Sequence, residues 1–289
     1  MPDGSGGMLM LYTIKYGEGS LRVALPDTLS VDVFTPRQAP PLADPLAVFA
    51  GALDKPEGCP RLEEMAVPES IAIALPDETR PFPIKLLLPV LLKKIFNVFP
   101  QIEHGNIRIV VGGGLHEPPD AAQLRRILPS ELHGCAVVSH DAKNSPVRRM
   151  GVTSRGTPVE INAAYADADL KIVMGMVDAH QFAGFTGGAK GVVVGWASAA
   201  MIAKNHSMLQ ASGAHAGNIE GNPVREDLNE AGEIAGVTLA VNVALTPEKQ
   251  IAALFVGNPP RIMRSAAQAT RRLYGLRLES AYDIVIASC

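Results

Sequence analysis

Short apolar runs that end in turn-forming residues recur along the chain and predict buried β-strands. These runs lie at 71–75, 107–111, 136–139, 170–177, 237–245 and 282–287. Longer segments with helical hydrophobic spacing lie between them, at 84–99, 197–209, 224–235 and 260–273. Residues 1–60 predict an irregular start, in which short alternating runs such as 21–25 could be small strands and the Pro-rich stretch at 36–45 is expected to be a loop.

Strands that alternate with helices predict an α/β fold with a mostly parallel sheet flanked by helices. In such a sheet, ligands bind beyond the carboxyl ends of the strands, so polar residues that follow strands are the first candidates for function. We expect residues 1–275 to form one cofactor-binding catalytic domain. The last apolar run needs cover that the sequence does not supply in full, so we interpret 276–289 as the first strand of a second α/β domain, truncated at the C-terminus.

Composition and charge exclude several classes of protein. The sequence has 289 residues, 47% of them hydrophobic, and a net charge of −3 without a basic stripe, so nucleic acid is not an expected partner. The apolar runs are shorter than a membrane span, and no signal peptide is evident. Cys59, Cys135 and Cys289 lie far apart without metal-site spacing, which is typical of a reducing compartment. We therefore expect a cytoplasmic protein without a membrane partner.

Polar residues follow the first two predicted strands. Asp77, Thr79 and Arg80 come after 71–75. The guanidinium of Arg80 suits a phosphate or carboxylate, and Thr79 could cap the next helix or bind a phosphate at its N-terminus. A capped helix start with a surface Asp–Arg pair explains these residues at least as well. His116 follows three glycines after 107–111 and could act as an acid or base, although a lone His after a glycine turn is more often structural.

The strongest candidate follows the strand at 170–177. His180 begins a glycine-rich segment that contains Gly187, Gly188 and Lys190. The spacing differs from a P-loop, because no Gly directly precedes Lys190 and no Ser or Thr follows it. Lys190 could be desolvated and nucleophilic, or it could be a solvated side chain on a flexible surface loop. The apolar run at 191–196 favours the packed alternative.

His206 lies near the end of the helix expected at 197–209. There it could be a cation stabilised by the helix dipole, which is the commoner case, or a metal ligand through a neutral ring nitrogen. The sequence has no zinc spacing, no Ser-His-Asp order and no nucleophile elbow. Residue chemistry alone therefore indicates an α/β enzyme with His, Lys and Arg at strand ends.

Together these motifs resemble the nickel-dependent lactate racemase family, from about residue 20 to the end of the chain. The matching text is DETRP at 77–81, GGGLHEP at 112–118, HDA at 140–142, GTPVEIN at 156–162, HQFAGFTGGAKG at 180–191, NH at 205–206 and GNPVRED at 221–227. Only the run at 180–191 is specific by itself. The order and spacing of the whole set carry the resemblance.

The resemblance implies a racemase or epimerase of a 2-hydroxy acid that uses a nickel-pincer nucleotide, a pyridinium bisthiocarboxylic acid mononucleotide of nickel. Lys190 matches the lysine that attaches this cofactor covalently, and His206 matches the protein ligand of nickel. His116 and His180 match two bases on opposite sides of the substrate, which racemisation requires. The hydride step is implied to belong to the cofactor.

The resemblance also implies how the nucleotide is held. Asp77, Thr79 and Arg80 match the motif that binds it, with Arg80 facing its phosphate, and Gly187 and Gly188 belong to the loop around it. The implied partners are a small-molecule 2-hydroxy acid substrate and the cofactor maturation enzymes.

Two departures from the family pattern flank the first catalytic histidine. Leu115 and Glu117 stand where the family commonly has Thr and Arg, and Glu in place of a cation could weaken carboxylate binding or change the substrate. The alternatives are a non-catalytic nucleotide- or cofactor-binding protein, or a half-enzyme that needs a partner domain. Phosphoryl transfer is less favoured, because the sequence lacks a P-loop and an acidic metal cluster.

Overall fold

The computed structural model describes residues 8–17 and 19–287 of the chain. The chain divides into two compact units, Arg37–Tyr274 and a smaller unit made of Met1–Pro36 with Gly275–Cys289. Cys289 and the end of the segment expected at 276–289 lie outside the described residues. Within the described ranges, no helix has the length and apolar character needed to cross a bilayer.

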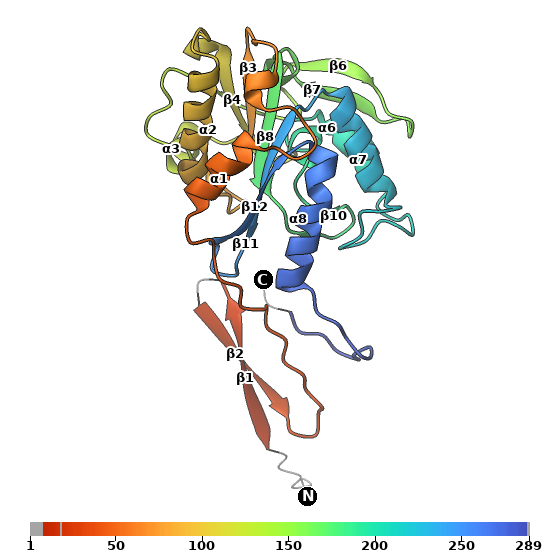
Figure 1. Cartoon of the computed structure of the whole chain (residues 1–289). Coiled ribbons are helices and arrows are strands. Elements are labelled where there is room, and N and C mark those ends of the chain that lie inside the picture. The colour runs from red at the N-terminus through yellow and green to blue at the C-terminus, as the bar shows by residue number, and fades with distance from the viewer. Residues whose placement is uncertain (1–7, 18, 288–289) are drawn as a thin grey trace, which may run out of the picture. The chain divides into compact units, whose positions relative to one another are not determined.

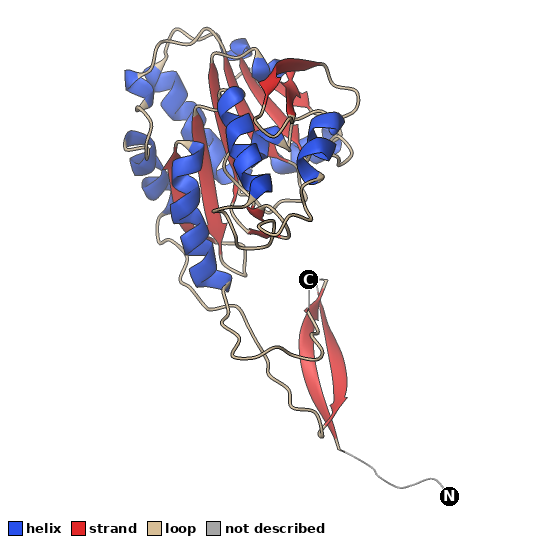
Figure 2. Ribbon diagram, turned by 90° about the vertical axis from the view of Figure 1, so that its right-hand side faces the viewer, coloured by secondary structure: helices blue, strands red, loops and turns tan. Residues whose placement is uncertain are grey.

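A six-stranded sheet forms the centre of the larger unit (Figures 1 and 2). In spatial order its strands are β12 (Ile251–Gly257), β11 (Leu239–Leu245), β8 (Leu170–Met176), β3 (Ile71–Pro76), β4 (Ile107–Gly112) and β5 (Ala136–Ser139). Neighbouring strands pair in parallel, except that β12 is antiparallel to β11. The α/β prediction is therefore confirmed, and each strand expected between 71 and 245 is present.

The order of the strands reverses between β3 and β8. From β3 the chain moves outward to β4 and β5, and it then returns to place β8 on the other side of β3. Loops that leave the carboxyl ends of β3 and β8 therefore diverge at this point. Open α/β sheets bind their ligands at such a reversal, so the topology itself marks the edge where a site is expected.

Helices cover both faces of the sheet (Figure 1). One core contains residues of α1 (Pro45–Asp54), α2 (Ile84–Val98) and α3 (Ala121–Ile127). The other contains residues of α4 (Ala163–Ala166), α5 (Lys190–Val193), α6 (Ala199–His206), α7 (Pro223–Ile234) and α8 (Pro259–Tyr274). Side chains alternate along β3, so that Ile71, Ile73 and Leu75 enter the first core while Ala72 and Ala74 enter the second.

Small residues bring α5 close to the sheet. Ala72 and Ala74 present only methyl groups to this face, and an added Cβ at Gly191 would lie 2.6 Å from Cγ2 of Val173 in β8. The backbone of α5 therefore lies directly against the centre of the sheet, which places Lys190 near the carboxyl ends of the strands.

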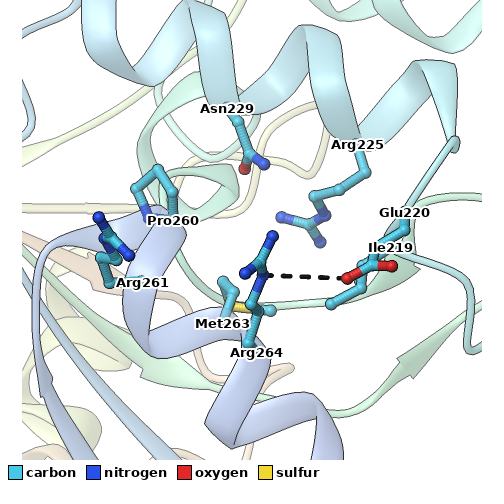
Figure 3. Close-up of a pocket in the computed structure, with 8 residues that line it drawn as sticks. All are labelled: Ile219, Glu220, Arg225, Asn229, Pro260, Arg261, Met263 and Arg264. Atoms are coloured by element: carbon cyan, nitrogen blue, oxygen red, sulfur yellow. Dashed lines mark ion pairs between the residues drawn. The ribbon is translucent and has the colours of Figure 1, made fainter.

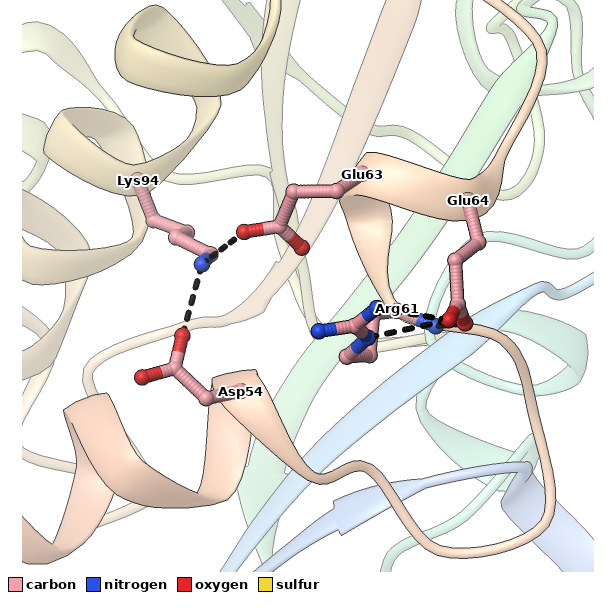
Figure 4. Close-up of polar contacts among 5 residues, drawn as sticks. All are labelled: Asp54, Arg61, Glu63, Glu64 and Lys94. Carbon is pink, nitrogen blue, oxygen red and sulfur yellow. Dashed lines mark hydrogen bonds and ion pairs between the residues drawn. The ribbon is translucent and has the colours of Figure 1, made fainter.

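Polar contacts join the elements that cover the first core. Lys94 on α2 donates to Asp54 at the end of α1, at 2.6 Å, and also to Glu63 of the 3₁₀ turn η1 (Leu62–Glu64) (Figure 4). A second 3₁₀ turn, η2 (His104–Asn106), precedes β4. Two short hairpins complete the larger unit: β6 (Val147–Val152) with β7 (Pro158–Asn162), and β9 (Ala179–His180) with β10 (Gly184–Phe185).

The start and the end of the chain differ from the sequence prediction. The run at 21–25 lies in β2 (Gly19–Pro26), so a strand there is confirmed, but the first sixty residues are more regular than expected, because β2 pairs with β1 (Leu9–Tyr16) in an antiparallel hairpin and Asp44 caps the helix α1. The strand expected at 282–287 is wrong: these residues are described and form no strand. Ile284 and Val285 are 73% and 77% exposed. An apolar run becomes a strand only when a neighbouring strand pairs with its backbone groups.

Two helical glycines offer a matched test of the packing. An added Cβ at Gly232 in α7 would lie 2.2 Å from that of Ala189, whereas at Gly51 in α1 it would meet no described atom within 4 Å. We expect Gly51→Ala to raise the free energy of unfolding by about 0.5–1 kcal/mol, because it restricts the unfolded chain. Gly232→Ala should lower it by about 1–3 kcal/mol, because α7 must shift. Denaturant unfolding measures both changes, and a Gly232→Ala protein as stable as the wild type would contradict the close packing.

Candidate active site

The candidate residues lie in loops at the carboxyl ends of three adjacent strands. Asp77 follows β3, His116 follows β4, and His180 lies shortly after β8. The loop after β4 is also joined to the segment after α5, because Gly114 donates its backbone N–H to the carbonyl of Gly195 at 3.1 Å. Residues distant in sequence therefore meet at one edge of the sheet.

Asp77 and His116 form a hydrogen-bonded pair. His116 Nδ1 lies 2.7 Å from Asp77 Oδ2, and Thr79 donates its backbone N–H and its hydroxyl to Asp77 Oδ1 at 3.1 and 2.6 Å. Burial acts to raise the pKa of Asp77, but the hydrogen bonds from Thr79 and His116 outweigh it, and the net pKa is lowered. The ionised carboxylate only accepts, so His116 Nδ1 carries a hydrogen, and in the neutral ring the lone pair is on Nε2.

Gly113 makes this pair possible. An added Cβ there would lie 2.0 Å from Asp77 Oδ2 and 2.6 Å from His116 Nδ1. The structure also excludes one alternative that the sequence left open, a helix start capped by Thr79 with a surface Asp–Arg pair, while phosphate binding by Thr79 stays a prediction. Pro83, not Thr79, is the N-cap of α2, and Asp77 bonds to His116 rather than forming a surface pair with Arg80.

Phe182 lies between His180 and His206. Its ring centroid is 4.7 Å from that of His180 and 4.9 Å from that of His206, and both contacts are edge-to-face. The backbone N–H of Ala183 donates to His180 Nδ1 at 3.2 Å, so the hydrogen of the neutral His180 ring lies on Nε2. His180 and His116 therefore hold their ring hydrogens on opposite nitrogens.

Lys190 is buried at the start of α5, with 9% of the residue exposed. Burial, followed by the charges of Arg225 and Arg80, lowers the pKa of its amine to about 7. A neutral amine is a nucleophile, and this pKa leaves much of Lys190 neutral near pH 7. The alternative of a solvated lysine on a flexible surface loop is wrong.

Burial and the charge of Lys190 act on both histidines of this region. Burial, followed by the charges of Lys190, Arg225, His206 and Arg80, lowers the pKa of His180 to about 3. Burial and the charge of Lys190 also lower the pKa of His206. Every charge in these sets is positive, so the site favours neutral imidazoles and an anionic ligand.

Arg225 is a buried cation of this region that the sequence analysis did not single out. It lies on α7, is 1% exposed, and donates to three carbonyl groups of the glycine-rich segment: Ala183 at 3.2 Å, Gly187 at 3.3 Å, and Phe185. Burial lowers its pKa to about 10, so it stays charged near pH 7. Its position within the GNPVRED motif was the signal available in the sequence.

Gly187 and Gly188 are required by packing. Both have positive φ, +83° and +60°, and an added Cβ would lie 2.6 Å from Val177 Cγ2 and 2.8 Å from Met263 Cγ, respectively. Packing within the protein and the positive φ angles are therefore enough to explain why glycine stands at both positions. Their role in cofactor binding stays a prediction.

Arg225 and Met263 also line a cavity of about 240 Å³ between α7 and α8 (Figure 3). Arg264 and Glu220 lie at this cavity, with 3.9 Å between Nε and Oε1. Within the described part of the chain, none of the predicted site residues lines it. It is therefore separate from the candidate site, although Arg225 contributes to both.

Residues 16–217 match the family model described as the lactate racemase N-terminal domain, which is more than half of the chain. The chain belongs to this family. The membership confirms the resemblance that the sequence motifs carry, at the level of the family and of its N-terminal domain.

Relatives and solved structures agree with the lactate racemase family. The lactate racemase of Lactiplantibacillus plantarum is 34% identical over 212 residues, which cover 72% of this chain and 49% of that protein. The lactate racemase of Thermoanaerobacterium thermosaccharolyticum is 28% identical over 282 residues, covering 95% and 65%. The apoprotein structure from the latter organism matches with a TM-score of 0.81 and 27% identity over 91% of this chain and 63% of that chain. A Thermotoga maritima protein, at 17% identity and a TM-score of 0.65 over 79% and 59%, shares the fold.

This member of the lactate racemase family thus spans about half to two thirds of the relatives that it matches. Within that span, Arg80, Lys190 and His206 lie close enough to His180 for their charges to lower its pKa, and His116 bonds to Asp77 in the loop that also carries Arg80. The chemical roles assigned to these residues stay predictions.

The lowered pKa of Lys190 predicts selective acylation. We expect its reaction with acetic anhydride to rise with pH around a midpoint near 7, because only the neutral amine reacts. An ordinary lysine needs a pH of about 10.4 for the same degree of deprotonation. Arg80→Gln removes one nearby cation and should move the midpoint upward. Peptide mass spectrometry across pH measures both, and a midpoint above about 9 would contradict the buried cationic environment.

Proposed function

We propose that the chain is the cofactor-binding, catalytic part of a lactate racemase-like racemase or epimerase of a 2-hydroxy acid. The observation that carries this proposal is the pair of histidines at one sheet edge, His116 oriented by Asp77 and His180 held neutral beside the buried amine of Lys190. Two bases and a nucleophilic lysine are the side chains that this chemistry needs from the protein. The relatives named lactate racemase support lactate or a similar acid as substrate.

The described residues fit the nickel-pincer nucleotide that the family resemblance implies. When bound, this cofactor supplies the acceptor and donor of hydride. The neutral amine of Lys190 suits covalent attachment, and the positive charges of Arg80 and Arg225 suit an anionic nucleotide. The neutral imidazole of His206 suits nickel. Among the described residues, no cluster of three or more His, Cys, Asp or Glu could hold a metal, so nickel here would take most of its ligands from the cofactor.

His116 and His180 hold their protons in complementary positions. In its neutral form His116 has a lone pair on Nε2 and can take the proton of a substrate hydroxyl, which leaves the ring as an imidazolium beside Asp77. Nε2 of neutral His180 carries a hydrogen and can donate a hydrogen bond to the same substrate oxygen. The imidazolium of His116 then returns its proton to the product oxygen, so that both rings end each turnover as they began it. Asp77 keeps His116 oriented throughout.

Co-expression with the cofactor maturation enzymes tests the proposal. We expect intact mass to show a covalent adduct, metal analysis to show about one nickel per chain, and the protein to interconvert the enantiomers of lactate. Lys190→Ala should lose both the adduct and the nickel. Unmodified protein under these conditions would refute the proposal.

The two histidines should separate catalysis from loading. His116→Ala and His180→Ala are each expected to keep the adduct and to lower kcat by about 10²–10⁴-fold, because each removes a general acid–base group. His215→Ala is the matched control: this exposed histidine lies 3.2 Å from the carbonyl of Ala216, and its loss should leave kcat unchanged. A full adduct without racemisation in the wild type would favour the alternative, a cofactor-binding protein or a half-enzyme that needs a partner domain.

A further inference from the structure

Three motifs of the family pattern meet in one buried chain of hydrogen bonds that ends at His206. The hydroxyl of Thr153 donates to Asp227 Oδ1 at 2.5 Å, Asn205 donates from Nδ2 to Asp227 Oδ2 at 2.7 Å, and His206 Nδ1 lies 3.1 Å from Asn205 Oδ1. Asn205 and Asp227 are 0% exposed, and Thr153 is 4% exposed. The backbone N–H of Thr157, from GTPVEIN, donates to the hydroxyl oxygen of Thr153 at 3.0 Å. The chain thus connects the turn between β6 and β7 to α7 and α6.

The acceptors at one end determine which way the Asn205 amide faces. Its Nδ2 contacts Asp227 Oδ2 and also the backbone carbonyl of Val224, at 3.3 Å. A backbone carbonyl can only accept, so the donor side of the amide must face this pair. The oxygen of Asn205 therefore faces His206, and an amide oxygen also only accepts. It follows that Nδ1 of His206 carries the hydrogen.

We propose that Asn205 and Asp227 are positioning residues that lock neutral His206 with its hydrogen on Nδ1 and its lone pair on Nε2. The two ring nitrogens point in different directions, so the contact with Asn205 also fixes the rotation of the ring. A nitrogen that binds a metal needs a lone pair, and partners beyond the ligand commonly hold it in that state. The use of the lock for nickel rests on the proposed function, whereas the lock itself does not.

The opposite tautomer is disfavoured in this arrangement. With the hydrogen on Nε2, the lone pair of Nδ1 would face the lone pairs of Asn205 Oδ1. Turning the amide of Asn205 would remove that clash but would place its oxygen against Asp227 Oδ2 and the carbonyl of Val224. Either change leaves buried polar groups unpaired, so we expect the locked tautomer to exceed the other by about tenfold or more.

Long-range ¹H–¹⁵N correlation spectra of the ¹⁵N-histidine-labelled full chain test the lock. The chain is made without maturation enzymes, measured at mildly alkaline pH, and the His206 signal is identified by its loss in His206→Gln. In the wild type we expect the Nδ1-protonated tautomer to dominate. Asp227→Asn keeps the side-chain volume but introduces an amide N–H donor, so the amide of Asn205 can turn over. The excess of the Nδ1-protonated tautomer of His206 should then fall at least several-fold. A wild-type mixture, or an excess of the other tautomer, would overturn the lock.

Thr153→Val is the matched control. It removes one hydrogen bond to Asp227 without adding a donor next to Asn205, so it should lower stability while the tautomer stays locked. An Asp227→Asn protein that keeps the full excess would overturn the role of Asp227. If Asp227→Asn does not fold, Asn205→Leu removes the acceptor directly, and a retained excess there would overturn the role of Asn205. A locked His206 in a chain that takes up no nickel after co-expression would instead refute the proposed function and leave the lock intact.

Discussion

The burial of positive charge at the carboxyl edge of the sheet is the constraint on which the site depends. Arg225 is buried beneath the glycine-rich segment, where its guanidinium donates hydrogen bonds to three backbone carbonyl groups. An isolated buried cation is strongly unfavourable unless such dipoles satisfy it. The guanidinium and the loop therefore stabilise each other, and the loop in turn carries His180 and Lys190 to the edge of the sheet. Burial and then the nearby positive charges lower the pKa of His180 to about 3 and that of Lys190 to about 7, so His180 is neutral near pH 7 and much of Lys190 is neutral too.

Close packing in the second core determines where these buried cations lie. Alanines on β3 and glycines at Gly191 and Gly232 let α5 and α7 approach the sheet and each other. A larger side chain at any of these positions would move the short helix that begins with Lys190. The packing of the second core therefore also sets the geometry of the site, because these few small residues determine where the buried amine of Lys190 lies.

Much of the larger unit could be predicted from the sequence, because its strands are short apolar runs and its helices show helical periodicity, and both are local signals. The elements that were missed have weaker local signals. The helix α1 begins at Asp44-Pro45, a cap and a first-turn proline that the Pro-rich context concealed. The run at 282–287 has the composition of a strand but no paired neighbour among the described residues, and composition cannot supply a partner.

The sequence by itself determined the alternation of strands and helices, the family, and the loops in which His116, His180 and Lys190 would be found. Only the tertiary structure decided that Lys190 is buried, that Asp77 bonds to His116, that Arg225 holds the loop, and that Asn205 faces His206 with its oxygen. The reason is that hydrophobic periodicity is a property of neighbouring residues, whereas these contacts join residues as many as 42 positions apart. Burial and hydrogen-bond direction exist only once those distant segments have come together.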